Sequence, residues 1–172
     1  KNRLGVLKIF QDLLQSGDCP DVHLVLVGPA LDGHLEAFIR EHGLESKILC
    51  TGPIGDSLLE AFYSRAEAFI FPSRHEGFGW PPVEAQSCGC PVVASNNGSL
   101  QEILGDSAMT AAWNDTKKHV DNLRRVLTEN SFRKVLINKG IENIKRFSAE
   151  KMTEAFFGIY CDLEEAHSPK VA

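Results

Sequence analysis

The chain has 172 residues, of which 43% are hydrophobic and 24% are charged, with a formal net charge of −5. This length and composition fit one globular domain with its own core. The negative charge argues against a general nucleic-acid binder, and no apolar run reaches the roughly 20 residues that a membrane-spanning helix needs. The five cysteines are an odd number without framework spacing, which predicts free thiols in a reducing compartment.

Hydrophobic periodicity predicts alternating helices and strands along most of the chain. In chain order, we expect a helix over 4–14, a strand over 22–28, a helix over 35–43, a strand over 47–51, a helix over 56–66, a strand over 68–71, a helix over 82–88, a strand over 91–94, a helix over 99–104, a strand over 108–112, and helices over 115–128, 131–146 and 149–165, followed by a frayed tail from 167.

This alternation predicts an α/β fold with a doubly wound, Rossmann-like parallel sheet. The strand over 22–28 is nearly unbroken in its apolar residues, which is typical of a strand buried on both faces. A complete fold of this kind starts with a strand, whereas this sequence starts with a helix. We therefore expect a first strand before Lys1, and a sequence that is part of a longer protein.

Four loops follow the carboxyl ends of the predicted strands, at 28–30, 52–55, 73–80 and 95–98. All four are rich in Gly, Ser, Asn or Pro. Each loop alone could be ordinary turn chemistry. In a parallel sheet, however, such loops gather at one edge, which is where ligands bind. The sequence therefore predicts a binding cleft at this edge.

The loop over 73–80 and the helix after it carry the strongest functional signal. Gly77 and Gly79 lack a Cβ atom, so a ligand can approach the backbone closely there. Pro81 suits a first helical position, and the helix N-terminus attracts an anion such as a phosphate. Glu76 and Glu84 bracket this turn with two carboxylates.

Structural interpretations of these residues remain open from the sequence alone. Glu76 could be a plain loop carboxylate, and Glu84 could simply favour the positive end of the helix dipole. Phe78 fits packing or ligand contact equally well, whereas Trp80 favours packing. Cys88-Gly-Cys90 could be half of a metal site, although a turn with two small buried thiols suits this spacing better.

Several motifs, in this order, resemble the C-terminal domain of the retaining GT-B glycosyltransferases of family 4, the glycosyl transferases group 1. The matching pieces cover essentially the whole chain: LVLVGPA, the pattern from Gly52 to Leu59, FPSRHEGFGWPPVEAQSCGCPVVAS, GSLQEILGDSA and the later RFS. The most specific piece is EGFG-x-P-P-x-E-A, with seven residues between its two glutamates.

The resemblance assigns roles to residues of the central loop. It implies that Glu76 is the catalytic carboxylate and holds hydroxyls of the transferred sugar. Gly77, Phe78 and Gly79 would place the sugar and the phosphates through backbone N–H groups. Glu84 would hold the ribose hydroxyls.

Further donor contacts are implied around this loop. Gly52 and Ile54 would meet the nucleotide base, and Lys1 would bind the diphosphate. The helix starting at Pro81 would stabilise the diphosphate charge as this group leaves. The resemblance implies no cofactor, because the donor is a nucleotide-diphosphate sugar and the chemistry needs no metal.

The resemblance therefore implies a hexosyltransferase that uses GDP-mannose or a UDP-sugar. Residues 1–166 would form the nucleotide-sugar-binding domain and 167–172 a tail. The acceptor, a polysaccharide, lipid-linked glycan or other glycoconjugate, would be held by an N-terminal domain outside this sequence, so the 172 residues alone would be inactive. We expect a cytoplasmic location, with peripheral membrane contact left open.

Two other functions stay open on the sequence. The first is a non-catalytic module that binds a nucleotide sugar. The second is a glycoside hydrolase that uses Glu76 and Glu84 as its carboxylate pair, which requires both groups to flank one glycosidic bond.

Overall fold

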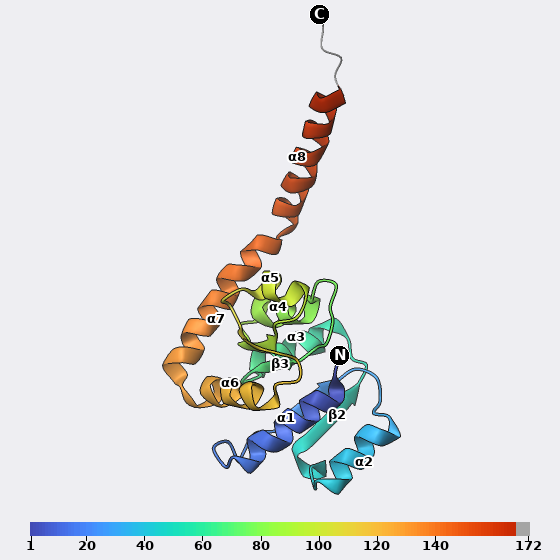
Figure 1. Cartoon of the computed structure of the whole chain (residues 1–172), viewed down its shortest axis with the longest axis vertical. Coiled ribbons are helices and arrows are strands. Elements are labelled where there is room, and N and C mark those ends of the chain that lie inside the picture. The colour runs from blue at the N-terminus through green and yellow to red at the C-terminus, as the bar shows by residue number, and fades with distance from the viewer. Residues whose placement is uncertain (168–172) are drawn as a thin grey trace, which may run out of the picture.

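A computed structural model describes residues 1–167, with helices and strands alternating over the first two thirds of the chain (Figure 1). The elements are α1 (Arg3–Gln15), β1 (Leu24–Val27), α2 (Gly33–Glu41), η1 (Glu45–Lys47), β2 (Ile48–Gly52), α3 (Asp56–Arg65), β3 (Phe69–Phe71), α4 (Trp80–Ser87), β4 (Val92–Ser95), α5 (Ser99–Leu104), β5 (Met109–Ala111), α6 (Thr116–Thr128), α7 (Asn130–Ile144), η2 (Lys145–Phe147) and α8 (Ala149–His167). The expected tail lies outside the described residues, apart from His167, which ends α8.

All the strands pair in parallel, which confirms the α/β class. They form two separate sheets, one in the order β1-β2 and one in the order β3-β4-β5. Within residues 1–167 no strand pairs with both β1 and β3, so the predicted parallel sheet is present in these residues as two parts.

The strand β1 is not buried on both faces as its apolar run predicted. Leu24 and Leu26 pack against the core, whereas Val25 is 38% exposed and Val27 is 39% exposed. Leu49 of the neighbouring strand β2 is exposed too. The prediction was wrong because apolar composition alone does not say which elements cover each face of a strand.

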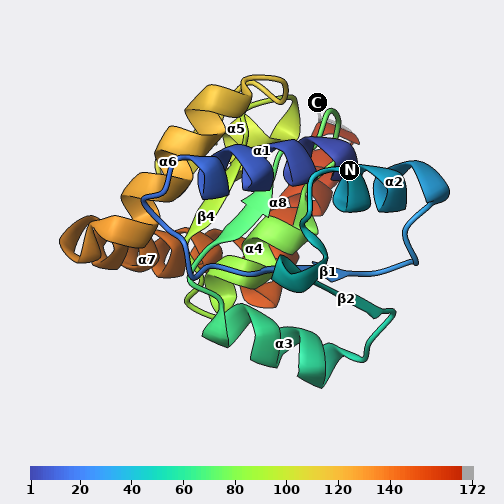
Figure 2. The ribbon, with the colours of Figure 1, turned by 90° about the horizontal axis from the view of Figure 1, so that it is seen from below.

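The helix α1 ties the two sheets together, as its course between α2 and α6 shows (Figure 2). Ile9 and Leu13 share a buried cluster with Val93 of β4. Leu7 belongs to a second buried cluster with Leu35 of α2, against which β1 packs. Burial of each large apolar side chain stabilises the fold by about 1.5–3 kcal/mol. The first helix therefore fixes the position of one sheet relative to the other.

The position of α4, which carries Glu84, is fixed by a buried polar network. Gln86 donates to the Ser107 carbonyl at 3.0 Å and accepts a hydrogen bond from Asn143 of α7 at 2.9 Å. Buried amides that are fully hydrogen-bonded specify one arrangement of their helices. Glu84 thus sits on a helix that Gln86 links to α7 and to the segment before β5.

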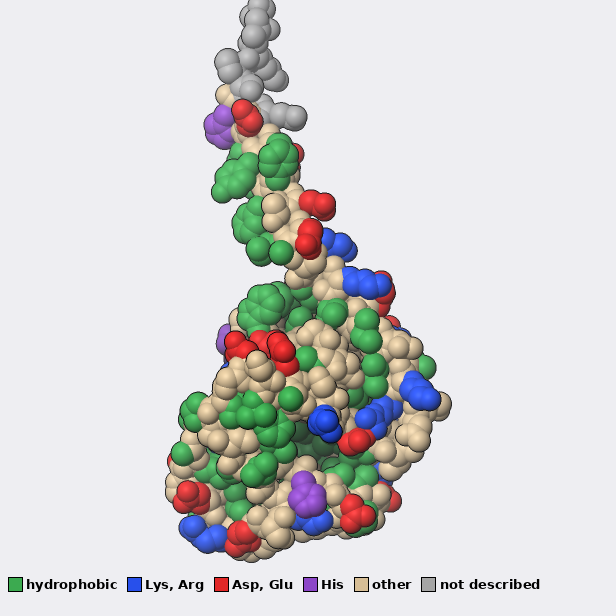
Figure 3. Space-filling model, turned by 180° about the vertical axis from the view of Figure 1, so that it is seen from behind, with side chains coloured by type: hydrophobic (Ala, Val, Ile, Leu, Met, Phe, Trp, Pro, Cys, Tyr) green, Lys and Arg blue, Asp and Glu red, His purple; other side chains and the backbone are tan. Residues whose placement is uncertain are grey.

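The last helix, α8, extends away from the body of the molecule (Figure 1). Apolar side chains gather on this projecting helix (Figure 3), and Met152, Phe156, Phe157, Ile159, Tyr160 and Leu163 are all exposed. Neither α8 nor any other helix of residues 1–167 is long and apolar enough to span a bilayer.

Candidate functional site

The start of α1 lies against the ends of three strands. Asn2 adopts the left-handed conformation, with φ of 57°, which Asn tolerates better than most residues. Its side chain donates to the Pro72 carbonyl after β3 at 2.9 Å and to the Trp113 carbonyl after β5 at 3.2 Å. Arg3 donates to the carbonyls of the loop after β1. These bonds place Lys1 beside the end of β3.

Glu76 lies in the loop after β3, and its side chain is only 10% exposed. Lys1 Nζ is 2.8 Å from both carboxylate oxygens, and Ser73 Oγ donates to Oε1 at 2.6 Å. The Lys1 ammonium also lies 5.1 Å from the centre of the Phe71 ring. The structure therefore brings together Lys1 and Glu76, which are 75 residues apart in the sequence.

The environment of Glu76 keeps its carboxylate ionised. Burial by itself raises the pKa of Glu76, but the hydrogen bonds from Lys1 and Ser73 lower it, and the combined effect is a pKa below the ordinary value. An ionised carboxylate is a pure acceptor, so it can bind hydroxyl groups but cannot donate a proton.

The rest of the loop carries two aromatic side chains, Phe78, which is partly buried, and Trp80, which is exposed. Phe78 packs against the core, with its ring centre 5.4 Å from that of Phe147 in an edge-on arrangement. The Trp80 ring lies tilted against Phe78, with 4.5 Å between the ring centres, and Trp80 stays 57% exposed. The preference for Trp80 as the packing residue is thus corrected, because Phe78 lies between it and the core.

The helix after this loop begins earlier than predicted, at Trp80 rather than Pro82. Gly79 precedes it in the left-handed conformation, with φ of 100°. Pro81 is therefore the second residue of the helix rather than the first. Because prolines lack an N–H group, Trp80 is the one residue among the first three of this helix that offers a free backbone donor.

The side chain of Glu84 has a different neighbour from that of Glu76, namely Tyr63. It is exposed, and the Tyr63 hydroxyl lies 3.4 Å from its Oε2, which is long for such a bond. Burial and then the Glu84 charge raise the pKa of Tyr63, so this hydroxyl stays protonated and can donate. Within residues 1–167, the two glutamates share no hydrogen-bond partner.

The loop after β2 joins the end of β1 rather than the Glu76 loop. The Gly28 N–H donates to the Gly52 carbonyl at 3.1 Å, and Gly52 has a φ of 71°. Ile54 is partly buried. No hydrogen bond or ion pair in the described part of the chain connects residues 52–55 directly with residues 73–80, and the contact of Gly52 and Ile54 with the nucleotide base stays a prediction.

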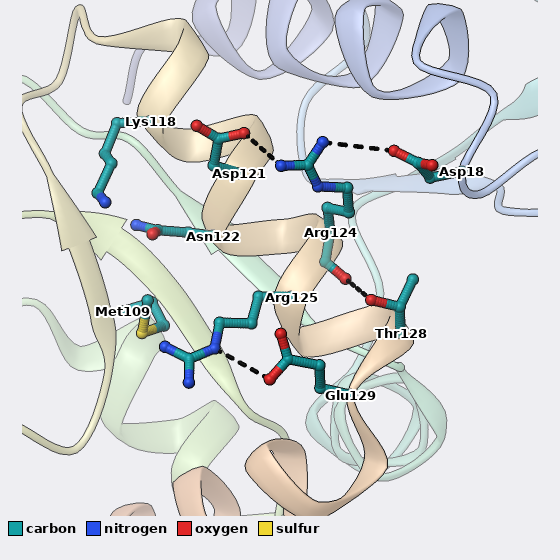
Figure 4. A pocket seen from close by; sticks show the side chains of 9 residues that line it. All are labelled: Asp18, Met109, Lys118, Asp121, Asn122, Arg124, Arg125, Thr128 and Glu129. Carbon is teal, nitrogen blue, oxygen red and sulfur yellow. Dashed lines mark hydrogen bonds and ion pairs between the residues drawn. The ribbon is translucent and has the colours of Figure 1, made fainter.

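A hollow of about 490 Å³ lies elsewhere, beside α6 (Figure 4). Its arginines are already neutralised, because Arg124 pairs with Asp18 and Asp121, and Arg125 pairs with Glu129. Cations that are paired in this way provide little field for an anionic ligand. We therefore place the candidate site at the Glu76 loop and not in this hollow.

Cys90 behaves as a buried apolar side chain. It is 2% exposed, and burial raises its pKa to about 12. A thiol with so high a pKa is a poor metal ligand and nucleophile, since both roles need the thiolate. Among the residues whose side chains the structure describes, no group of three His, Cys, Asp or Glu could hold a metal ion.

The two glycines of the loop differ in what a side chain would meet, which makes a stability test. A Cβ atom at Gly79 would lie 2.4 Å from the buried Leu100 side chain, whereas nothing lies within 4 Å of one at Gly77. We expect Gly79→Ala to lower the free energy of unfolding by about 2 kcal/mol, from overpacking and a strained φ. Gly77→Ala, the matched control, should change it by less than about 0.5 kcal/mol. Urea denaturation measures both, and equal effects would contradict this account of the loop.

Sequence reasoning missed the polar residues that hold the site from behind. Asn2, Ser73 and Tyr63 bond to the loop, to the residue before it or to its glutamates, and none of the three was a predicted site residue. Ser73 follows the end of β3 by two residues, and a small polar residue at that place is the signal that could have identified it.

Comparisons with known proteins agree on a family. The family model described as glycosyl transferases group 1 matches residues 1–143. The chain is similar to O-antigen chain mannosyltransferase B of Escherichia coli, with 37% identity over 162 residues, which are 93% of this chain and 42% of that protein. The chain thus spans less than half the length of this relative.

Solved structures show the same fold. Sucrose-phosphate synthase from Thermosynechococcus elongatus matches with a TM-score of 0.77 and 25% identity, over 92% of this chain and 43% of that one. A pneumococcal O-GlcNAc transferase in complex with UDP and GlcNAc matches with a TM-score of 0.78 and 17% identity, over 98% of this chain and 34% of that one.

Proposed function

Because this chain belongs to the glycosyl transferases group 1 family, we propose that it is the donor-binding part of an enzyme that transfers a hexose from a nucleotide-diphosphate sugar. The observation that carries the proposal is the Glu76 site. A carboxylate that is nearly buried and kept ionised stands beside a cation, at the carboxyl end of a parallel strand. Carboxylates bind sugar hydroxyls, and ammonium groups bind phosphates.

We assign the parts of the donor to this arrangement as follows. Glu76 accepts hydrogen bonds from sugar hydroxyls, while Lys1 and the N–H groups around Gly77 and Gly79 hold the diphosphate. Glu84 accepts from the ribose hydroxyls, and the loop with Gly52 and Ile54 meets the base. The dipole of α4 adds a modest attraction for the leaving diphosphate.

The proposed donor is GDP-mannose, with a UDP-sugar as the second choice. Relatives named as mannosyltransferases, among them O-antigen chain mannosyltransferase B and the serotype-specific mannosyltransferase WbdA of Escherichia coli, support mannose. UDP and GlcNAc are bound in the pneumococcal neighbour, which supports the second choice.

We propose further that transfer retains the anomeric configuration, needs no metal and takes place in the cytoplasm, with a glycan or lipid-linked acceptor of a polysaccharide pathway. The acceptor site is assigned to the part of the protein outside these 172 residues, so this chain alone binds a donor without transferring its sugar. The length of the relatives supports this division, because the chain spans 42% of the mannosyltransferase.

A glycoside hydrolase fits the site less well. Its general acid must stay protonated near neutral pH, which requires a raised pKa. The pKa of Glu76 is lowered instead, and Glu84 is exposed and has its own partner in Tyr63. The two carboxylates therefore lack the environments that divide acid and base roles.

Binding of nucleotides tests the proposal directly. Thermal unfolding of the full-length protein should be measured with GDP-mannose, UDP-glucose, UDP-GlcNAc, GDP and UDP. A ligand at 100 times its Kd should stabilise the protein by about 2.7 kcal/mol, and one base should be preferred over the other. If none of the nucleoside diphosphates or their sugars shifts the transition, the proposed function is wrong.

A further inference from the structure

Three serine hydroxyls hold the Glu76 loop from its inner side. Ser95 at the end of β4 is fully buried and donates to the Ser73 carbonyl at 2.5 Å. Ser99 at the start of α5 lies 2.9 Å from the Glu76 carbonyl and 3.1 Å from the Phe78 carbonyl. These two serines fix the course of the backbone and leave the Glu76 carboxylate to other groups.

Ser73 is the serine that reaches the carboxylate itself. Its hydroxyl has one proton and two acceptors nearby, Glu76 Oε1 at 2.6 Å and the His75 carbonyl at 3.3 Å. The Ser73 hydroxyl donates its hydrogen bond to the carboxylate, because that oxygen is nearer and is charged, and charge-assisted hydrogen bonds are short and strong.

Burial separates the role of Ser73 from that of Lys1. Lys1 is 60% exposed and approaches Glu76 from the solvent side, so a diphosphate could attract it away. Ser73 is fully buried, so no ligand can replace it or contact it. When Lys1 moves to a phosphate, the Ser73 bond remains to hold the carboxylate.

We infer that Ser73 is a positioning residue for the sugar end of the donor, acting only through Glu76; this rests on the function proposed above. Its hydrogen bond holds one carboxylate oxygen and directs the other toward the sugar hydroxyls. Holding the carboxylate before the donor arrives removes the cost of ordering this side chain on binding. The nucleoside diphosphate lacks the transferred sugar, whose hydroxyls are assigned to Glu76, so its binding gains nothing from Ser73.

Calorimetric titration of the full-length protein tests this role of Ser73. The ligands are GDP-mannose and GDP, or UDP-glucose and UDP if the protein prefers uridine nucleotides. We expect Ser73→Ala to weaken binding of the sugar nucleotide about tenfold, the effect of losing a hydrogen bond to a charged group. Binding of the nucleoside diphosphate should change less than twofold. In a Glu76→Gln background, Ser73→Ala should have little further effect on either ligand.

Two further variants make the result decisive. Ser64→Ala, the matched control, removes an exposed hydroxyl that donates to the Glu60 carbonyl within α3, and it should leave both affinities unchanged. Ser73→Cys keeps the size of the buried side chain but replaces a strong donor by a weak one, so it tests the same bond if Ser73→Ala does not fold.

Three results would overturn the inference: no loss in Ser73→Ala and Ser73→Cys, an equal loss for sugar nucleotide and nucleotide, or a loss that persists in the Glu76→Gln background. In each of these the wild-type protein still binds the sugar nucleotide, so the proposed function survives. Failure of the wild-type protein to bind any of the four ligands would instead overturn the proposed function together with the role of Ser73.

Discussion

Glu76→Gln in the full-length protein is expected to lower kcat/KM for sugar transfer about 100-fold or more. Glutamine has nearly the same size, but it replaces a charged acceptor by a neutral amide. A hydrogen bond to a charged group contributes about 1.5–3 kcal/mol, and its loss at a reacting sugar also costs orientation. Steady-state kinetics with a radiolabelled sugar nucleotide measure the change.

The same substitution at Glu60 is the matched control for this experiment. Glu60 is exposed on α3, and we expect Glu60→Gln to leave transfer unchanged. Glu76→Gln also removes the ion pair with Lys1, so folding of the variant must be verified by its thermal transition. Transfer at the wild-type rate by a folded Glu76→Gln variant would contradict the proposed role and would favour a carboxylate elsewhere.

A full-length wild-type protein that binds sugar nucleotides but never transfers sugar would support a different function, the non-catalytic module. In that protein, Glu76→Gln would lower donor affinity without any change in turnover. The experiment on Glu76 therefore separates an enzyme from a binding module as well as testing one residue.

Glu84→Gln is expected to weaken binding of the nucleoside diphosphate itself about tenfold, because the ribose hydroxyls lose a charged acceptor. Glu76→Gln should leave that affinity nearly unchanged, since Glu76 is assigned to the sugar. Calorimetric titration with GDP and UDP measures both. Tyr63→Phe should weaken nucleotide binding less than Glu84→Gln, because the hydroxyl lies 3.4 Å from Glu84 and makes only a weak bond.

The opposite pattern of affinities would refute the assignment of Glu84 to the nucleotide end of the donor and of Glu76 to its sugar end. If Glu84→Gln weakened only the sugar nucleotide, and Glu76→Gln weakened the nucleotide alone, the donor would lie in the reverse direction across the loop. Equal weakening by both variants would mean that the two carboxylates act on the same part of the donor.

Lys1 and Glu76 form an ion pair in which each neutralises the charge of the other. We propose that an arriving diphosphate competes for Lys1 and thereby frees the outer side of Glu76 for the sugar. Breaking a partly exposed ion pair costs little, at most about 1 kcal/mol. The pair can therefore hold both side chains in place without opposing the donor strongly.

Local patterns were sufficient to predict the elements and the α/β class of this protein. The helix ends at α3, α5 and α6 agree with their predicted ranges within a residue or so, because apolar spacing and caps such as Asp115 act within one turn. The Glu76 loop was predicted from adjacent residues for the same reason. Its glycines and glutamates are close in space because they are close in sequence.

Contacts between distant residues needed the tertiary structure. The apolar run at 22–28 does not indicate that Val25 and Val27 are exposed, because the elements that cover each face of a strand come from distant parts of the chain. The pairing of Lys1 with Glu76 arises because Asn2 binds the ends of β3 and β5. Ser73 is only three residues from Glu76, but in a loop that spacing does not determine side-chain direction, so only the folded backbone decides that its hydroxyl meets the carboxylate.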